Sequence, residues 1–378
     1  MQELNSPVAP GKGQGKVTRK IFTLLSSSKL AMSLLIGILA CCITGVTIFR
    51  GERAWSLIFN TLWFNGFLVL LVVNIAFCFF PRMWGRKVTL VSLGMILFHL
   101  SFVAMLGGIV YGSLFYFKGS IRLTEGESLP SGQAESYDSI AKGRFFDFSK
   151  LKGETTLIRM HREYKVDGTD KRSAYEIAVG DGISKKKGII YITHSLEHNG
   201  FSYFNDREGY SVLIVLYDKQ GRELYGGHIP LQGLKQKDGA YLYTTGTKYG
   251  PGSFPFPSKP ENPRFNLQVA YRPSKLTERG GEAAFNIWPL KKDGAGQGGK
   301  PLAEGKAAVG ENFDAGDYFI SAKEVRYWVG MTVRYDPGKP IVLTSLWVAL
   351  GGLIITFSGR LQKRKPRSAI SDQQSANV

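Results

Sequence analysis

The chain has 378 residues, enough for two or three ordinary domains or for one domain and a membrane-embedded part. Hydrophobic residues make up 44% of it, charged residues 21%, and the formal net charge is +18. The apolar residues are concentrated in four stretches that contain no Asp, Glu, Lys or Arg. This distribution excludes a soluble enzyme, a secreted disulfide scaffold and a disordered chain, and it indicates a membrane protein.

The four uncharged stretches cover residues 30–49, 57–80, 88–117 and 341–358. Each reaches the roughly 18–20 residues that an α-helix needs to cross the hydrocarbon core of a bilayer. We therefore predict a region of three transmembrane helices over 30–117 and a fourth transmembrane helix over 341–358.

Basic residues flank alternate ends of these helices. They are concentrated in an N-terminal arm (1–29), in the loop 81–87 and in the tail 359–378. The positive-inside rule then places both termini in the cytoplasm and residues 118–340 on the other side of the membrane. The first stretch is too long for a cleaved signal peptide. No basic–aromatic module accompanies the charge, so we expect no nucleic-acid binding.

Residues 118–340 are rich in Val, Ile, Tyr and Phe, often in alternation with polar residues, and turn sequences separate the runs. We predict one large extracytoplasmic β-rich domain that is sandwich-like, either as a single body or in two lobes. The clearest strand sequences are GIIYITHS, YSVLIVLY, GAYLYTT, RFNLQVAY, AAFNIWPL and DYFISAKEVRYWVGMTVRY.

The three cysteines, Cys41, Cys42 and Cys78, all lie in predicted transmembrane helices. The extracytoplasmic domain therefore has no thiol to form a disulfide or to attack a substrate. Any thiol chemistry in the pathway of this protein has to come from a partner.

His99 is the only histidine within a predicted transmembrane helix. It follows Val88 by 11 residues, so it lies about 16 Å along the helix and near the middle of the bilayer. Polar side chains at that depth are costly and indicate a functional site. Small residues lie opposite His99 on the helical wheel, and such a stripe allows another helix to approach closely. The stripe consists of Gly94, Ser101, Ala104, Gly108 and Gly112.

An imidazole among apolar side chains is a common ligand of haem iron. The alternative is a neutral structural histidine that forms one hydrogen bond to a helix carbonyl or a serine hydroxyl. Since no second histidine lies in a predicted transmembrane helix, a haem bound by two histidines would need its other ligand from a partner.

Several strings, in this order and spacing, resemble the cytochrome c biogenesis protein ResB family, also called CcsB. WFNGFLVLLVVNIAFCFFPR is similar to the second span of the family, and HLSFVAMLGG followed by GSIRLTEGES is similar to its third span and exit. VGMTVRYDPGKPIVLTSLWVALGG resembles the start of its last span. YITHSLEHNGFSYFN resembles an outer-domain pattern, although Thr193, Ser195 and Asn205 replace the Asn, Pro and Gln of that pattern. The resemblance covers about residues 24–358.

The resemblance implies that the protein exports haem and presents it for attachment to apocytochrome c. His99 occupies the position of a family histidine that is an axial ligand of haem iron, and a CcsA/ResC-like membrane subunit supplies the opposite ligand. The haem b would thus be shared with that partner. Apocytochrome c and a thiol–disulfide reductase of the same pathway are the other implied partners. The chain is then not a complete enzyme alone but a component of a holocytochrome c synthase complex.

Outside the membrane, His194 is the best candidate for a contact with haem or apocytochrome, because it lies in a family-like string. His161, His198 and His228 are weaker candidates. His194 and His198 are four residues apart, which would suit a metal on a helix, but the surrounding pattern predicts a strand and a turn.

Two other functions stay open. In one, the β-rich domain alone is a membrane-anchored chaperone or scaffold for apocytochrome, and His99 is structural. In the other, the chain is a b-type electron carrier, which would need two axial histidines in one helix bundle.

Overall fold

The computed structural model describes residues 22–49, 51–83, 89–236, 239, 241–247, 250–258, 261–274, 279–290 and 301–364. The predicted arm up to residue 21, most of the predicted loop 81–87 and the tail beyond residue 364 lie outside the described residues. The chain divides into two compact units. A helical unit comprises residues 1–117, 142–146 and 335–378, and a β unit comprises residues 118–141 and 147–334.

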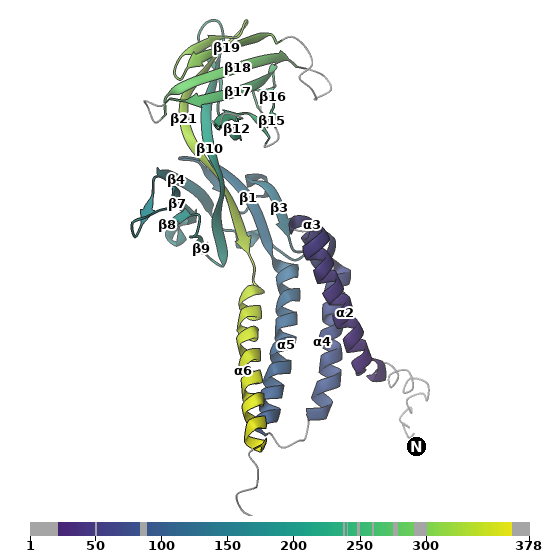
Figure 1. Ribbon diagram of the computed structural model, residues 1–378. Coiled ribbons are helices and arrows are strands. Elements are labelled where there is room, and N and C mark those ends of the chain that lie inside the picture. Colours follow the sequence, from purple (N-terminus) through teal and green to yellow (C-terminus); the bar gives the residue numbers. More distant parts are fainter. Residues whose placement is uncertain are drawn as a thin grey trace, which may run out of the picture. The chain divides into compact units, whose positions relative to one another are not determined.

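Among the described residues, four helices are long and apolar enough to cross a membrane: Ser28–Phe49, Leu62–Phe79, Leu90–Phe115 and Lys339–Gln362. They correspond to α2 (Ser28–Thr44) with the π-helical turn η1 (Gly45–Phe49), α4 (Leu62–Met83), α5 (Leu90–Phe115) and α6 (Lys339–Arg364), as Figure 1 shows. The predicted set of four membrane helices is confirmed.

The connection between the first two transmembrane helices differs from the prediction. We expected a short loop over 50–56 and a second helix from residue 57. Instead, α3 (Gly51–Ala54) and a π-helical turn, η2 (Trp55–Phe59), continue the helical structure, and α4 begins only at Leu62. Charged residues end an apolar run, but Glu and Arg are good helix formers. The composition therefore marked the end of the membrane-crossing part and not the end of the helix.

Helices α2, α4 and α5 share an apolar core, to which η2 also contributes. Its buried residues are Leu34, Ile58, Phe64, Leu68, Leu71 and Leu106. Two buried asparagines of α4 add polar links. Asn65 accepts a hydrogen bond from the hydroxyl of Ser113 on α5 at 2.7 Å, and the side-chain amide of Asn74 donates to the carbonyls of Leu25 and Ser27 before α2. Such bonds satisfy backbone groups that lipid could not.

Helices α5 and α6 meet along a seam of small residues. A Cβ atom added at Gly94 would lie 2.6 Å from the carbonyl oxygen of Gly352, and one added at Gly352 would lie 2.8 Å from the carbonyl oxygen of Gly94. At the other end of the seam, a Cβ at Gly108 would lie 3.0 Å from Cγ2 of Ile341. The predicted close approach of another helix along this stripe is therefore confirmed, and its occupant is α6 of the same chain.

The seam has a regular spacing. Gly94, Ser101 and Gly108 on α5 are seven residues apart, and so are Gly338, Ser345, Gly352 and Gly359 in and just before α6. A seven-residue period keeps small side chains on one face of two helices that coil gently around each other. Since Gly94 faces Gly352 and Gly108 faces Ile341, the two helices are antiparallel. The assignment of Ala104 to this stripe was wrong, because Ala104 is exposed. Gly112 does belong to it: a Cβ atom at Gly338 would lie 2.8 Å from Cα of Gly112.

The β unit contains three main sheets of the described residues. The largest has the order β11 (Glu223–Pro230), β10 (Phe201–Tyr217), β21 (Phe319–Tyr335), β1 (Phe117–Thr124) and β3 (Tyr137–Lys142), with β20 (Asn312–Asp314) beside β21 and β9 (Leu196–His198) beside β10. The second has the order β12 (Gln232–Lys235), β13 (Tyr241–Thr244), β17 (Phe265–Pro273), β18 (Gly281–Pro289) and β19 (Ala303–Ala308), with β16 (Phe254–Phe256) beside β17. The third has the order β2 (Ser128–Pro130), β4 (Glu154–Arg162), β7 (Ser173–Gly180) and β8 (Lys186–Tyr191).

The predicted β-rich domain is confirmed, and each of the six strand sequences named above contains a strand. They correspond to β8, β10, β13, β17, β18 and β21. Strands β10 and β21 are 17 residues long. Figure 1 shows them running from the sheet that holds β17 and β18 to the strands around β4, β7 and β8. These two long strands of the largest sheet thus extend from the second sheet to the third.

A buried carboxylate links separate strands of the β unit. Glu125, whose side chain is 7% exposed, follows β1 and accepts hydrogen bonds from the backbone N–H of Met160 on β4 at 2.8 Å and from the guanidinium of Arg279 at 3.0 Å. The guanidinium of Arg326 on β21 donates to the Glu125 carbonyl. Because a buried charge needs hydrogen-bond partners, this one residue fixes three strands around the turn that follows β1.

The seam between α5 and α6 generates a stability prediction. We expect Gly352→Ala to lower the free energy of unfolding by about 1–3 kcal/mol, since the added methyl group meets the α5 backbone. Gly351→Ala is the matched control, because no atom lies within 4 Å of a Cβ at that position. Thermal unfolding of the detergent-solubilised protein measures both. Equal midpoints for the two variants would show that α5 and α6 do not pack through this seam.

Candidate functional site

His99 is the tenth residue of α5, a helix of 26 residues. At a rise of 1.5 Å per residue it lies about 5 Å from the midpoint of the helix. Its side chain is half-buried. The structure therefore places the imidazole well inside the membrane-crossing length of α5.

The hydrogen bonding of His99 identifies the ring nitrogen that carries a proton. Nδ1 lies 2.8 Å from the carbonyl oxygen of Met95, one turn earlier on α5. A carbonyl oxygen can only accept a hydrogen bond, so Nδ1 carries the proton and donates it. In the neutral tautomer with this proton, the lone pair is on Nε2. Histidines that bind metals commonly donate their other ring N–H to a carbonyl in this way, which orients the ring.

Two phenylalanines surround the imidazole. The ring of Phe79 on α4 stacks on it, with centroids 4.1 Å apart and planes 10° from parallel. The ring of Phe98 meets it edge-on at 5.5 Å. A metal binds imidazole in the plane of the ring, so a stacked phenyl group covers a face and leaves the Nε2 edge free of that contact. The arrangement fits one axial ligand of haem iron in an apolar setting.

Phe79 was not singled out from the sequence. It lies in the aromatic string FCFF at the end of the second uncharged stretch, which looks like any lipid-facing segment. Only the packing of α4 on α5 brings it to His99. Leu106, two turns after His99 on α5, is buried in the core with α2 and α4.

His194 lies in the β unit, in a tight turn that follows β8. Its backbone N–H donates to the carbonyl of Tyr191 at 2.8 Å, and the Tyr191 N–H donates to the carbonyl of His194 at 3.1 Å. The imidazole is exposed and stacks on the Tyr191 ring at 5.1 Å. Ile192, at the tip of this turn, is 74% exposed. His194 is thus accessible to a large partner.

The other histidines of the β unit lie in separate places and have different partners. His198 accepts a hydrogen bond from the Asn199 side-chain amide at 3.1 Å, and it ends β9 at a two-residue Asn199–Gly200 hairpin, where both residues have positive φ. His161 on β4 lies 3.6 Å from the Glu176 carboxylate on β7. The strand-and-turn prediction for the His194 and His198 region is confirmed, and the described residues contain no group of three or more metal-ligating side chains.

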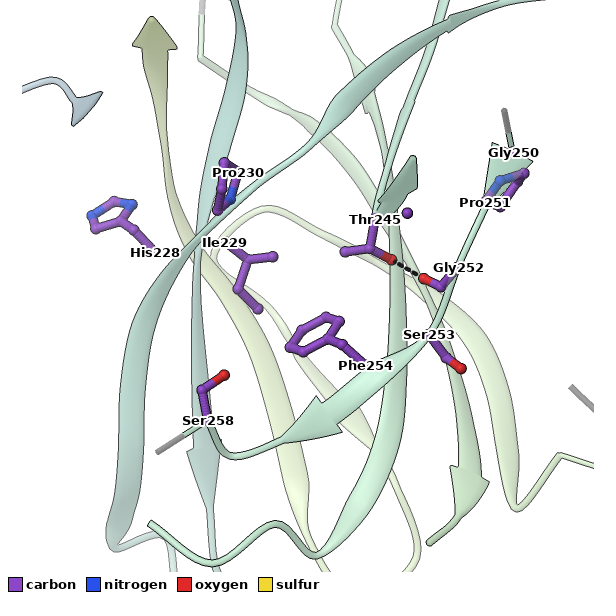
Figure 2. Close-up of a pocket in the computed structure, with 11 residues that line it drawn as sticks. His228, Ile229, Pro230, Thr245, Gly250, Pro251, Gly252, Ser253, Phe254 and Ser258 are labelled. Carbon is purple, nitrogen blue, oxygen red and sulfur yellow. Dashed lines mark hydrogen bonds between the residues drawn. The ribbon is translucent and has the colours of Figure 1, made fainter. Parts of the chain in front are cut away.

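A cleft of about 510 Å³ lies in the β unit. It is lined by His228, Ile229, Pro230, Thr245, Gly246, Gly250, Pro251, Gly252, Ser253, Phe254 and Ser258. Figure 2 shows Ile229 beside Phe254, whereas the His228 ring points away from Phe254 and Ser258. Burial, and secondarily the nearby Arg326, lowers the pKa of His228 below its ordinary value. His228 is therefore neutral at neutral pH and lies at the margin of an open cleft with few polar side chains.

Comparisons with known proteins agree with the predicted resemblance. Residues 85–204 match the model of the ResB-like family, and this segment contains both His99 and His194. The cytochrome c biogenesis protein CcsB of Picosynechococcus sp. is 20% identical over 278 residues, which cover 73% of this chain and 52% of that protein. The chain thus spans about half the length of the curated relative that it matches. The family resemblance is confirmed.

The hydrogen bond of His99 to Met95 generates a spectroscopic prediction. In the isolated protein, ¹⁵N NMR of labelled histidine should show a proton on Nδ1 of His99. The spectrum of His99→Gln, which lacks this signal, assigns it. A proton on Nε2 would contradict the geometry described here.

Proposed function

We propose that this chain, a member of the ResB-like family, is a haem-handling subunit of a cytochrome c assembly complex. It exports haem across the membrane and presents it for attachment to apocytochrome c. The name of the relative from Picosynechococcus sp. supports a role in cytochrome c biogenesis. Four helices able to cross a membrane and a large β unit support a place in a membrane complex.

The observation that carries the proposal is the state of His99. Its Nδ1 proton is held by the Met95 carbonyl, so Nε2 can donate its lone pair to iron. The stacked Phe79 ring and the edge-on Phe98 ring orient the imidazole in apolar surroundings. Haem is the cargo here, and its iron would take His99 as one axial ligand.

A second ligand has to come from a partner, which we propose to be a CcsA/ResC-like membrane subunit. The five histidines of the chain include only one in a predicted transmembrane helix. The other four, His161, His194, His198 and His228, all belong to the β unit. Haem b is then held at the boundary between two subunits, where it can be passed on.

The β unit would receive apocytochrome c. The chain has no cysteine in residues 118–340, so it cannot reduce or trap the haem-attachment cysteines of a client. A thiol–disulfide reductase of the pathway would keep those thiols reduced. His194, exposed on a turn beside Ile192, is the side chain of the β unit that we propose to contact haem or apocytochrome.

A second candidate function is an apocytochrome-binding chaperone that uses only the β unit. It is favoured by the same contacts of His99, because one hydrogen bond and a stacked ring also satisfy a structural histidine. The cleft beside Phe254 would then be a place for an extended client segment. Haem content of the complex distinguishes the two functions.

Removal of His99 is the decisive change. In the complex with its partner subunit, His99→Ala should lower the haem content about tenfold or more, because one axial ligand is lost. Free imidazole should partly restore haem, since it fits the cavity and supplies a nitrogen. His99→Leu should lose haem equally but resist imidazole, because its side chain fills the space. The absorbance of the purified complex measures all three.

The control is His194→Ala, which should keep intramembrane haem but slow the delivery of haem to apocytochrome. A structural His99 predicts another order: Leu tolerated better than Ala, with no response to imidazole. Wild-type haem content in His99→Ala would exclude the ligand role and would leave the chaperone function as the better one.

We also propose that both termini are cytoplasmic and that residues 118–340 are extracytoplasmic in a bacterial cytoplasmic membrane. Alkaline phosphatase, which is active only after export, should be inactive when fused after Val378. The same enzyme inserted at Gln220, in the exposed turn between β10 and β11, should be active. The reverse pattern would show that the positive-inside rule fails for this chain.

A further inference from the structure

A short segment of the β-rich region of the sequence belongs to the helical unit. Residues 142–146, Lys-Gly-Arg-Phe-Phe, begin at the last residue of strand β3 and are grouped with the membrane helices, whereas residues 118–141 and 147–334 form the β unit. We refer to residues 142–146 as the KGRFF loop.

The KGRFF loop is fixed to the end of α5 by its backbone. The N–H of Gly143 donates to the carbonyl of Tyr116 at 2.8 Å, and the N–H of Phe145 donates to the carbonyl of Leu114 at 2.9 Å. A Cβ at Gly143 would lie 2.8 Å from the backbone nitrogen of Phe115, so this approach needs a glycine. The ring of Phe146 stacks on Phe117 at 4.6 Å. These contacts hold the loop in one position on the helix end.

The side chains that the loop presents outward are aromatic and basic. Phe145 is 57% exposed, and its ring lies 5.8 Å from that of Phe115, which in turn lies 4.9 Å from Tyr111. Arg144, next to Phe145, is also exposed. Phe145 thus extends a row of aromatic rings that begins on the exposed side of α5 with Tyr111, itself 39% exposed.

The length of α5 gives the depth of this row. Its 26 residues extend about 39 Å, which exceeds the roughly 30 Å of the hydrocarbon core. The last turns of α5, with Phe115, therefore reach the headgroup region. Phe145, bonded through its backbone to Leu114, lies at the same level. Aromatic rings and arginine side chains are the groups that favour this layer, since each has an apolar body and a polar or charged end.

We propose that the KGRFF loop binds anionic phospholipid: the Phe145 ring inserts at the boundary of the acyl chains, and the Arg144 guanidinium pairs with lipid phosphate. The continuity of Phe145 with the exposed aromatic face of a membrane helix favours lipid over a protein partner. The positive charge of Arg144 favours an anionic headgroup. The KGRFF loop would act as an anchor that keeps the chain after β3 at the membrane surface.

The first arm of the test measures the depth of Phe145. A nitroxide label is attached to Phe145→Cys in a background without Cys41, Cys42 and Cys78, and the protein is reconstituted in vesicles of phosphatidylcholine and phosphatidylglycerol. The label should be more accessible to oxygen than to an aqueous nickel complex. A label at Ile192→Cys, on the exposed turn of the β unit, is the control and should show the opposite order. Equal accessibility to nickel at both positions would overturn the insertion.

The second arm measures the headgroup contact. Arg144→Gln should weaken the binding of phosphatidylglycerol to the full-length protein about fivefold, and the effect should shrink at high salt. Arg159→Gln, which removes an exposed arginine of β4, is the matched control and should bind like the wild type. Inorganic phosphate should not compete. An unchanged affinity in Arg144→Gln, or competition by phosphate, would overturn the lipid assignment. Neither arm depends on haem, so its result stands apart from the proposed function.

Discussion

The close contact of α5 with α6 is the constraint on which the rest of this molecule depends. Two glycines, Gly94 and Gly352, let the helix backbones approach to a distance that no side chain allows. In lipid there is no hydrophobic force between helices, so van der Waals contact of this kind has to hold them. The seam also determines what α5 offers elsewhere. With one face closed by α6, the face that carries His99 turns toward α4 and the core of the bundle.

That division of α5 into two faces explains why a single imidazole can be both well held and chemically available. The Met95 carbonyl and the Phe79 ring satisfy the polar and apolar sides of His99 without using Nε2. A histidine held this way costs little inside a membrane. Its Nε2 lone pair can then bind a ligand that contains a metal. Without such a ligand, this lone pair is an acceptor without a hydrogen bond, which costs free energy in an apolar setting.

Much of this arrangement follows from the sequence because lipid imposes a strict composition. The four uncharged stretches predicted the membrane helices. The positions of Gly94 and Gly108 on the helical wheel of α5 predicted the seam. Other features needed the three-dimensional structure. Ala104 is as small as the residues of the seam but is exposed. The helical turns around Trp55 follow charged residues that indicated a loop. Strand β4 mixes charged and polar residues with apolar ones in an irregular order, so its alternation was weak. Phe79 reaches His99 only through the packing of two helices.

The order of strands in the largest sheet has a consequence for how the protein is made. Strand β21 lies between β10 and β1, yet it is the last of these strands in the chain. While the ribosome synthesises residues 118–318, both β1 and β10 present an edge with no neighbour, and such edges pair readily with the wrong chain. The sheet can close only when residues 319–335 have been synthesised, immediately before α6. Completion of the sheet and insertion of the last helix are therefore consecutive events. A chain that ends before residue 319 keeps unpaired strand edges, which chaperones or proteases can bind.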